Sequence, residues 1–343
     1  MRRFVGKCLI VAAVLAQAGC AANAAESKSK SGYLAHPEAQ KWLKEQTEAG
    51  LDSQALEQLL AAAKKQKSIL EAISRPAERR LTWGEYRKIF IEPKRINQGL
   101  KFWQTHADVL ARAEKEFGVP AEVIVAIIGV ETRYGRIMGS YRVVDALATL
   151  GFDYPKRGKF FRKQLAEYAQ LVAEEKMDPL AQKGSYAGAM GFGQFIPSSY
   201  RAYAVDFDGD GKRDILTNRV DAIGSVANYF ARHGWKSGEP VLGTVKFGDK
   251  AIDDSWFNAG LKPKVSLTEW AERGIATDSS LAASQPATLM KMKMKDGDLY
   301  WLGLHNFYVI TRYNHSRLYA MAVYELSQII REKYQQQQVA KGA

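Results

Sequence analysis

Glu131 is the residue of this chain whose surroundings most directly predict chemistry. It closes a largely apolar run, residues 119–130, and a carboxyl group held against hydrocarbon resists ionisation. A carboxyl group that keeps its proton near neutral pH can act as a general acid. Pro120 suits the first turn of a helix and Gly118 suits the end of the preceding one. The run therefore predicts a buried helix whose last turn delivers Glu131 to a surface or cleft.

The same residue has a simpler interpretation as a structural glutamate. The polar segment after the run contains Arg133 and Arg136, and either arginine can pair with a carboxylate at a helix end. This segment alone leaves both interpretations open.

A second candidate is the stretch of residues 184–200, in which four glycines alternate with tyrosine, phenylalanine, serine and glutamine. Glycines let a ligand approach the backbone closely. Aromatic rings with amide and hydroxyl groups suit a sugar, whose faces are apolar and whose edges are polar. The stretch lacks the lysine of a phosphate-binding loop and does not follow a strand as a dinucleotide motif must. The alternative is a tight connection packed in the core.

A third candidate resembles a calcium-binding loop. Within residues 206–214, carboxylates occupy positions 1, 3, 5 and 9 of the loop and glycine occupies position 6. Thr217 stands at position 12, where a bidentate acid is usual, and a longer loop can bring Asp221 round instead. The pattern predicts calcium or another hard cation, and the alternative is an acidic turn without metal. The predicted ligands are Asp206, Asp208, Asp210, Asp221 and the backbone carbonyl of Lys212.

Other chemistries lack support in the sequence. The five histidines show no zinc-hydrolase spacing, and Ser198 and Ser199 follow no nucleophile elbow. Aromatic residues crowd residues 300–319, where Tyr313, Asn314 and Tyr319 sit among polar neighbours and can line a cleft.

The first residues predict export. Arg2, Arg3 and Lys7 precede an apolar stretch too short to span a bilayer, which is typical of a signal peptide. Two cleavage sites compete, one after Ala24 and a lipoprotein-like site before Cys20, and we favour the second. Only Cys8 and Cys20 are present, so the mature chain has no cysteine pair for a disulfide, and its core must hold the fold.

The charge is basic. Removing the three basic residues of the signal takes the formal net charge from +12 to +9, which favours an anionic partner such as cell-wall polymer or lipid headgroups. Export makes nucleic acid the least favoured of these partners.

The elements that would carry the candidate residues are mostly helical. Residues 37–74, 102–117, 161–175, 222–233 and 316–333 have apolar residues at helical spacing, and Asp145 is placed to cap a further helix at its N-terminus. Residues 238–302 are rich in glycine and proline and alternate like strands. The 343 residues thus predict a mainly α protein with a small β-rich insertion and a frayed tail from residue 335.

Several stretches together resemble the membrane-bound lytic murein transglycosylase B family. The resemblance rests on residues 129–135, 184–200, 206–214 and 311–316, supported by residues 145–150 and 221–230, and extends from about Leu81 to Ile330. It implies cleavage of the β-1,4 bond between N-acetylmuramic acid and N-acetylglucosamine in peptidoglycan, with formation of 1,6-anhydromuramic ends and no cofactor for the chemistry.

The resemblance also implies an architecture, in the α+β class but mainly α. A lysozyme-like helical core is expected at residues 101–237, with the calcium loop at 206–221 and a cleft-lining segment at 303–315. A helical domain is expected from residues 25–100 and the C-terminal helix 316–334, a β-rich domain from 238–302, and the export signal and tail from 1–24 and 335–343.

By the same resemblance, Glu131 is the single acid and base. The substrate-binding residues are expected to be Tyr86, Arg157, Ser185, Gln194, Tyr229, Tyr313, Asn314 and Tyr319. The family implies a periplasmic enzyme, held at the outer membrane if Cys20 is lipidated, with cell-wall synthesis proteins as further partners. Two departures stand out: the acidic loop lacks its late carboxylate, and Gln17 replaces an aliphatic residue in the lipoprotein site.

An ordinary retaining glycosidase needs a second carboxylate beside the acid, and the motif around Glu131 contains none. A muramidase that uses water remains an alternative, as does a non-catalytic peptidoglycan-binding scaffold.

Overall fold

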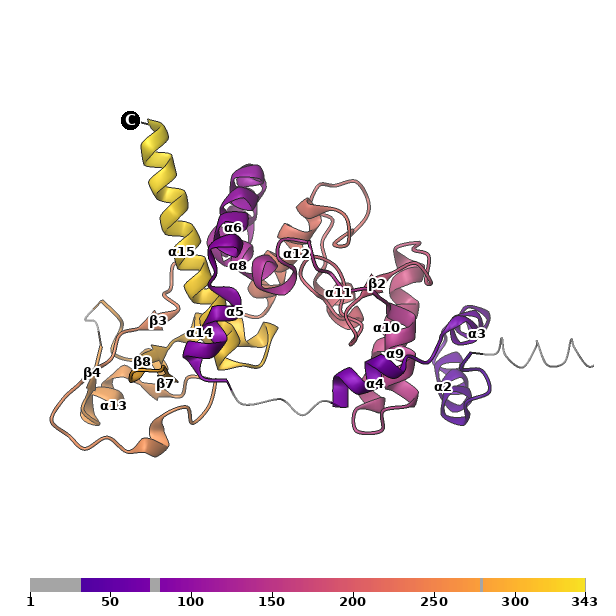
Figure 1. Ribbon diagram of the computed structural model, residues 1–343, viewed down its shortest axis with the longest axis horizontal. Helices are drawn as coiled ribbons and strands as arrows, with labels where there is room; N and C mark the ends of the chain where they lie inside the picture. Colours follow the sequence, from indigo (N-terminus) through magenta and orange to yellow (C-terminus); the bar gives the residue numbers. More distant parts are fainter. Residues whose placement is uncertain (1–31, 75–80, 278–279, 343) are drawn as a thin grey trace, which may run out of the picture.

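The computed structural model describes residues 32–74, 81–277 and 280–342, and its helices dominate, as predicted. Figure 1 shows an elongated molecule with helices α2 and α3 at one end and the β-rich part at the other. The helices are α2 Pro37–Glu48, α3 Ser53–Ala62, α4 Lys67–Ser74, α5 Trp83–Phe90, α6 Pro93–Thr105, α7 Ala107–Phe117, α8 Ala121–Thr132, α9 Val143–Phe152, α10 Gly158–Glu174, α11 Pro197–Tyr203, α12 Arg219–Arg232, α13 Leu267–Glu272, α14 His305–Tyr313 and α15 Arg317–Gly342, with the 3₁₀ helix η1 Asp254–Trp256. No helix in these described ranges is long and apolar enough to cross a membrane.

Helix α8 is the centre of the core. Every residue from Ala121 to Val130 is buried, because the helix is apolar on all its faces and packs against other helices all round. Helices α6, α7, α12 and α15 all contact it. Gly118 ends α7 in the left-handed conformation, with a φ of 71°, as its place in the sequence predicts.

The N-terminal helices attach to the far side of the core. Helices α3 and α4 pack on α10 and α9, and the carboxylate of Asp145 accepts a hydrogen bond from the backbone amide of Lys64 at 2.8 Å. Helices α5 and α6 instead contact α15. The predicted unit of residues 25–100 with the C-terminal helix is thus divided within the described residues: α15 packs on α5 and α6, whereas α3 and α4 pack on the core.

Three predicted boundaries are wrong. Helix α9 begins at Val143, so Asp145 lies within its first turn, where its carboxylate pairs with Arg142. The predicted helix 102–117 breaks at His106, between α6 and α7. Helix α15 does not end near residue 334, because the glutamine-rich segment that follows has good helix propensity and contains no proline.

The β-rich part follows α12, as predicted. A four-stranded antiparallel sheet has the order β3, β8, β7, β5, with Met290 paired to Trp301 at the centre of the long hairpin. Its own small core includes Trp270, Leu289 and Leu302. The strands are β1 Tyr141–Arg142, β2 Lys183–Gly184, β3 Leu242–Gly243, β4 Lys246–Phe247, β5 Val265–Ser266, β6 Ile275–Ala276, β7 Pro286–Lys293 and β8 Asp298–Gly303.

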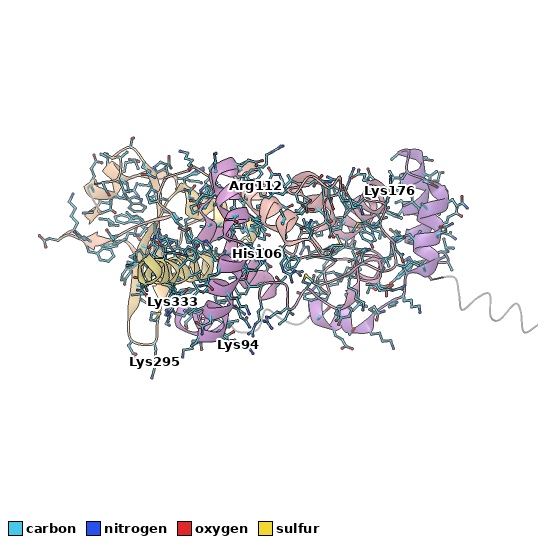
Figure 2. The ribbon with its side chains drawn as sticks, turned by 90° about the horizontal axis from the view of Figure 1, so that it is seen from above. Lys94, His106, Arg112, Lys176, Lys295 and Lys333 are labelled. Carbon is cyan, nitrogen blue, oxygen red and sulfur yellow. The ribbon has the colours of Figure 1, made fainter. Side chains whose placement is uncertain are left out.

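Basic side chains are spread over the length of the molecule. In Figure 2, Lys295 lies in the β-rich part and Lys176 lies toward the opposite end, next to α10. The net positive charge is therefore not confined to one region.

Candidate active site

Glu131 is the exception on the buried helix α8. It lies in the last turn and is partly exposed to solvent, whereas its neighbours Val130 and Thr132 are buried. The helix ends at Thr132, because Arg133 and Tyr134 adopt left-handed backbone conformations with φ of 51° and 61°. Two successive residues of this kind turn the chain sharply away from the helix axis. The buried helix thus ends by presenting one carboxyl group, as the sequence predicts.

Thr132 fixes the end of this helix to the glycine-rich stretch. Its hydroxyl donates a hydrogen bond to the carbonyl of Phe192 at 2.9 Å and accepts one from the amide of Gly135 at 2.9 Å. Thr132 is a site residue that no sequence pattern predicted. Its position directly after Glu131 was the available signal.

The carboxyl group of Glu131 has one hydrogen-bond partner among the described residues. The phenol of Tyr319, near the start of α15, donates to Oε1 at 2.5 Å. Burial raises the pKa of Glu131 from 4.5 to about 7, and the hydrogen bond from Tyr319 partly opposes this rise. Arg133 pairs instead with Glu92, at 3.0 Å. The interpretation of Glu131 as a helix-end residue neutralised by a neighbouring arginine therefore does not hold.

Among the described residues, no second carboxylate acts on Glu131. Within the described ranges, no charged carboxylate lies near enough to influence the pKa of Glu131, which is governed by burial and by Tyr319. A glycosidase that works by two carboxylates places them about 5–9.5 Å apart. The site thus offers a single acid, which must also serve as the base if a second proton transfer is needed.

Three tyrosines from distant parts of the chain surround Glu131. Tyr86 belongs to α5, Tyr313 to α14 and Tyr319 to α15. Burial raises the pKa of each phenol, and the charge of Glu131 raises it further. Tyr313 donates a hydrogen bond to the carbonyl of Gly193 at 2.6 Å, which ties α14 to the glycine-rich stretch. The structure therefore brings together these three of the predicted residues with Glu131, and it keeps the phenols neutral.

Tyr229, predicted to line the cleft, is almost fully buried. Its side chain is 8% exposed, its ring stacks on His233 at a centroid distance of 4.0 Å, and its hydroxyl donates to the carbonyl of Arg312 at 2.6 Å. The ring also contacts Tyr313, at 4.7 Å. Tyr229 falls on the buried face of α12, where its phenol finds a backbone partner and its ring supports Tyr313. Its contact with a sugar stays a prediction.

The predicted sugar-binding residues of the glycine-rich stretch are partly exposed. Ser185 accepts hydrogen bonds from the amides of Ala187 and Ala189, at 3.3 and 3.1 Å, so its hydroxyl also shapes the turn. Gln194 has a φ of 52° and donates from Nε2 to the carbonyl of Met138 at 3.2 Å. Both side chains therefore hold backbone segments as well as facing solvent.

Two further predicted residues lie apart from the carboxyl group. Arg157 is exposed at the start of α10, with its guanidinium 4.4 Å from the ring centre of Phe160. Asn314 is exposed at the end of α14, next to Tyr313. The structure shows neither side chain in contact with Glu131.

The acidic loop gathers three of its predicted ligands. Carboxylate oxygens of Asp206, Asp208 and Asp210 lie within 4.8 Å of one another. Asp206 accepts hydrogen bonds from the amides of Gly209 and Gly211, at 2.7 and 2.8 Å, which bends the loop around its carboxylate. An all-oxygen donor set of this kind fits a hard cation such as calcium.

Asp221 does not join this cluster. Its side chain is fully buried, and it accepts hydrogen bonds from the amides of Phe207 at 2.7 Å and Asp214 at 2.8 Å. It therefore holds both ends of the loop from inside. It anchors the loop and, contrary to the prediction, does not lie among the metal ligands. Lys212 is exposed, and its amide donates to Asp210 at 2.9 Å.

Comparison with known proteins identifies relatives that share this architecture. The family model of the transglycosylase SLT domain matches residues 35–328. Membrane-bound lytic murein transglycosylase B of Escherichia coli (strain K12) is 44% identical over 308 residues, which cover 87% of this chain and 84% of that protein.

Solved structures agree. The catenated lytic transglycosylase SltB1 from Pseudomonas aeruginosa is 52% identical, with a TM-score of 0.85 over 88% of this chain and 99% of that chain. Escherichia coli Slt35 in complex with calcium is 43% identical, with a TM-score of 0.80 over 88% and 95%. Pseudomonas aeruginosa SltB3 in complex with NAG-anhNAM-pentapeptide is 33% identical, with a TM-score of 0.77 over 85% and 78%.

The raised pKa of Glu131 predicts a pH-dependent gain in stability for Glu131→Gln. The folded protein binds a proton here up to about pH 7 and the unfolded chain only up to about pH 4.5, so native stability falls as pH rises between these values. At pH 8 the free energy of unfolding of the glutamine variant should therefore exceed that of the parent protein by at most about 3 kcal/mol. Near pH 4 the two free energies should be equal. Melting curves at both pH values check this, with the exposed Glu116→Gln as the control. A gain at pH 4 as large as that at pH 8 would contradict the assignment.

Tyr319→Phe should move the titration of Glu131 to higher pH. The phenol stabilises the carboxylate, so its removal leaves burial unopposed. Carbon-13 NMR of labelled glutamate side chains would follow the midpoint directly. Tyr324→Phe on the same helix is the control and should leave the midpoint in place; a shift equal to that of Tyr319→Phe would argue against a local effect.

Proposed function

The chain belongs to the lytic murein transglycosylases that carry the transglycosylase SLT domain, and we propose that Glu131 is the single acid and base with which it cleaves peptidoglycan. The scissile bond is the β-1,4 bond between N-acetylmuramic acid and N-acetylglucosamine. The observation that carries this proposal is a carboxyl group with a pKa of about 7 and no second carboxylate beside it among the described residues.

In the first step, protonated Glu131 donates its proton to the glycosidic oxygen. The bond between this oxygen and C1 of the muramic residue breaks, and the electron pair leaves with the oxygen of the departing N-acetylglucosamine. A pKa near the working pH suits this role, because the acid is present in its protonated form and still gives up the proton readily. Glu131 is left as a carboxylate, which the hydrogen bond from Tyr319 stabilises.

In the second step, the carboxylate accepts the proton of the C6 hydroxyl of the same muramic residue. The C6 oxygen forms a bond to C1, which closes the 1,6-anhydro ring and returns Glu131 to its protonated form. No water is consumed, and one carboxyl group serves both transfers. This sequence needs neither a nucleophilic carboxylate nor a separate base, in keeping with the isolated position of Glu131.

The surrounding residues supply the sugar contacts in this proposal. Tyr86 and Tyr313 offer aromatic surfaces beside Glu131. Ser185, Gln194 and Asn314 offer hydroxyl and amide groups to the 2-acetamido group and the sugar edges. Arg157, which is exposed, is available to a carboxylate of the lactyl group or the peptide stem.

The reaction product distinguishes this proposal from its alternatives. The protein should release muropeptides from purified peptidoglycan whose muramic end is one water lighter than a reducing sugar, as measured by mass spectrometry. Glu131→Gln keeps the shape but lacks the transferable proton, and it should lower release by at least about a thousandfold. The exposed Glu116→Gln should release product normally.

Other products would indicate a different function. A reducible muramic end would make the protein a muramidase. Undiminished release by Glu131→Gln would remove Glu131 from the chemistry, and absence of any product from the parent protein would favour a binding scaffold.

A structural calcium ion is part of the proposal. Slt35 of Escherichia coli was solved in complex with calcium, and Asp206, Asp208 and Asp210 of this chain provide a matching cluster of oxygen donors. Lys212 can add its backbone carbonyl, and Asp221 holds the loop in shape rather than binding the ion. The ion has no part in the chemical steps.

Calcium removal should lower the melting temperature, because an ion that binds only the folded state stabilises it. A chelator should lower it by several degrees, and added calcium should restore it. Asp208→Asn should melt near the chelated protein and respond little to calcium, whereas the exposed Asp249→Asn should respond like the parent. An unchanged melting curve with chelator would remove the ion from the proposal.

Location follows from the sequence signal and the relative. The Escherichia coli relative is named membrane-bound, and Cys20, outside the described residues, is the residue that a lipid anchor would modify. A periplasmic enzyme attached to the outer membrane in this way would meet its glycan substrate directly. Cell-wall synthesis proteins are its expected protein partners.

A further inference from the structure

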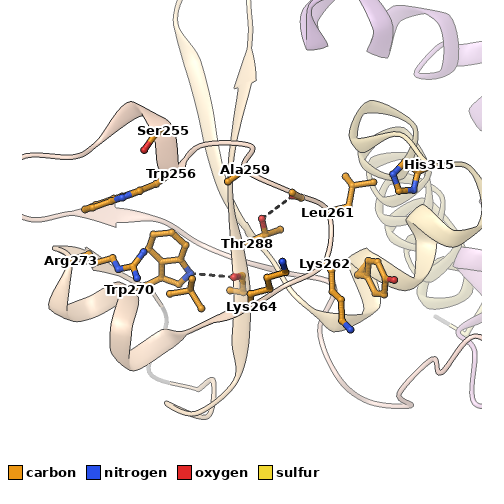
Figure 3. Close-up of a pocket in the computed structure, with 14 residues that line it drawn as sticks. Ser255, Trp256, Ala259, Leu261, Lys262, Lys264, Trp270, Arg273, Thr288 and His315 are labelled. Carbon is orange, nitrogen blue, oxygen red and sulfur yellow. Dashed lines mark hydrogen bonds between the residues drawn. The ribbon is translucent and has the colours of Figure 1, made fainter.

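A pocket of about 410 Å³ lies in the β-rich part of the molecule, away from Glu131. The loop of residues 255–265, strand β7 and the ends of α13 and α14 line it, as Figure 3 shows. This volume falls in the range of about 300–1,000 Å³ that small-molecule sites occupy. Nothing in the proposed mechanism uses it.

One side of this pocket is aromatic and rigid. Trp256 and Trp270 pack edge to face with ring centroids 6.1 Å apart, and the guanidinium of Arg273 lies 5.4 and 5.1 Å from the two ring centres. The indole nitrogen of Trp270 donates to the carbonyl of Ala287 at 3.3 Å, which fixes the ring on strand β7. This side thus presents an apolar surface with one held positive charge.

The rest of the lining is cationic. Lys262 and Lys264 are exposed and form no ion pair with any described residue, and Figure 3 shows them between the tryptophan side and His315. None of the fourteen lining residues is acidic. The pocket therefore favours an anionic ligand.

Three acids close in sequence to the lining residues have other partners. Asp253 accepts a hydrogen bond from the amide of Ser255 at 2.8 Å, and Asp254 lies 3.8 Å from the ammonium group of Lys291. Glu269 closes a capping box with Ser266. These carboxylates have partners other than the two lysines.

The pocket is joined to the active site through its own loop. Asn258 is bound to strand β7 through Leu289 and Lys291, and its carbonyl accepts a hydrogen bond from Arg317 at 3.0 Å. Arg317 begins α15, two residues before Tyr319, which contacts Glu131. The loop that lines the pocket is thus hydrogen-bonded to the start of the helix that carries Tyr319.

We propose that this pocket binds a carboxylate-bearing stem peptide of peptidoglycan while the core holds the glycan. The inference rests on the proposed function, since it takes peptidoglycan as the substrate. Stem peptides combine free carboxylates with small apolar side chains, which match the lysines and the tryptophan surface. Lys262, Lys264 and Arg273 contact the carboxylates, and Trp256 contacts the apolar groups.

Direct binding of a peptide tests this without turnover. The probe is L-Ala-γ-D-Glu-L-Lys, compared by calorimetry with the same peptide whose carboxylates are amidated. The parent protein should bind the free acid at least tenfold more tightly than the amide. Lys262→Glu with Lys264→Glu should lose at least tenfold, whereas Lys295→Glu, the same charge change in the exposed hairpin of the same domain, should stay within twofold.

Activity provides the second readout. The double lysine variant should release muropeptides from intact sacculi at least threefold more slowly than the parent, and should match it on glycan strands from which an amidase has removed the stems. All three lysines are exposed, and melting temperatures report whether each variant folds like the parent.

Three results would overturn the proposal. These are equal binding of the acid and amide peptides, equal binding of the peptide by the double variant and the parent, and lysine-dependent binding of anionic phospholipid vesicles without peptide binding. Because the peptide contains no glycosidic bond, lysine-dependent binding would stand even if no glycan were cleaved. A failure of the proposed function is thereby distinguished from a failure of this one.

Discussion

The hydrogen bond between Glu131 and Tyr319 joins the two parts on which the active site depends. Glu131 lies in the last turn of the buried helix α8, and Tyr319 lies near the start of α15. Burial raises the pKa of the carboxyl group, and the phenol restrains the rise so that it reaches about 7 rather than higher. The acid strength of the site is therefore a balance between desolvation by α8 and donation by α15.

The glycine-rich stretch is arranged around the same end of α8. Thr132 binds the carbonyl of Phe192, and Tyr313 binds that of Gly193, so the stretch is held from both the catalytic helix and α14. Neither contact involves Glu131, but both fix the positions of residues close to it. The precision of the site rests on backbone carbonyls as much as on side chains.

Local patterns in the sequence predicted much of the fold and the central residue. The apolar run before Glu131 and the glycine at residue 118 act within a few residues, and the structure agrees with them. The failures depend on tertiary contacts. Asp221 was expected to bind the metal because it is the next carboxylate after the acidic loop, but it falls on the buried face of α12 and binds backbone groups instead. The break at His106 likewise has no proline or glycine to signal it.

The place of Tyr319 in the chain bears on the order in which the enzyme becomes competent. Ribosomes add residues from the N-terminus, so Glu131 and its helix are made almost two hundred residues before Tyr319. A growing or partly exported chain contains the acid but lacks the phenol, the neighbouring Tyr313 and the helix that covers α8. The site cannot assemble until the last helix has emerged, and a truncated chain that lacks α15 would lack a finished active site.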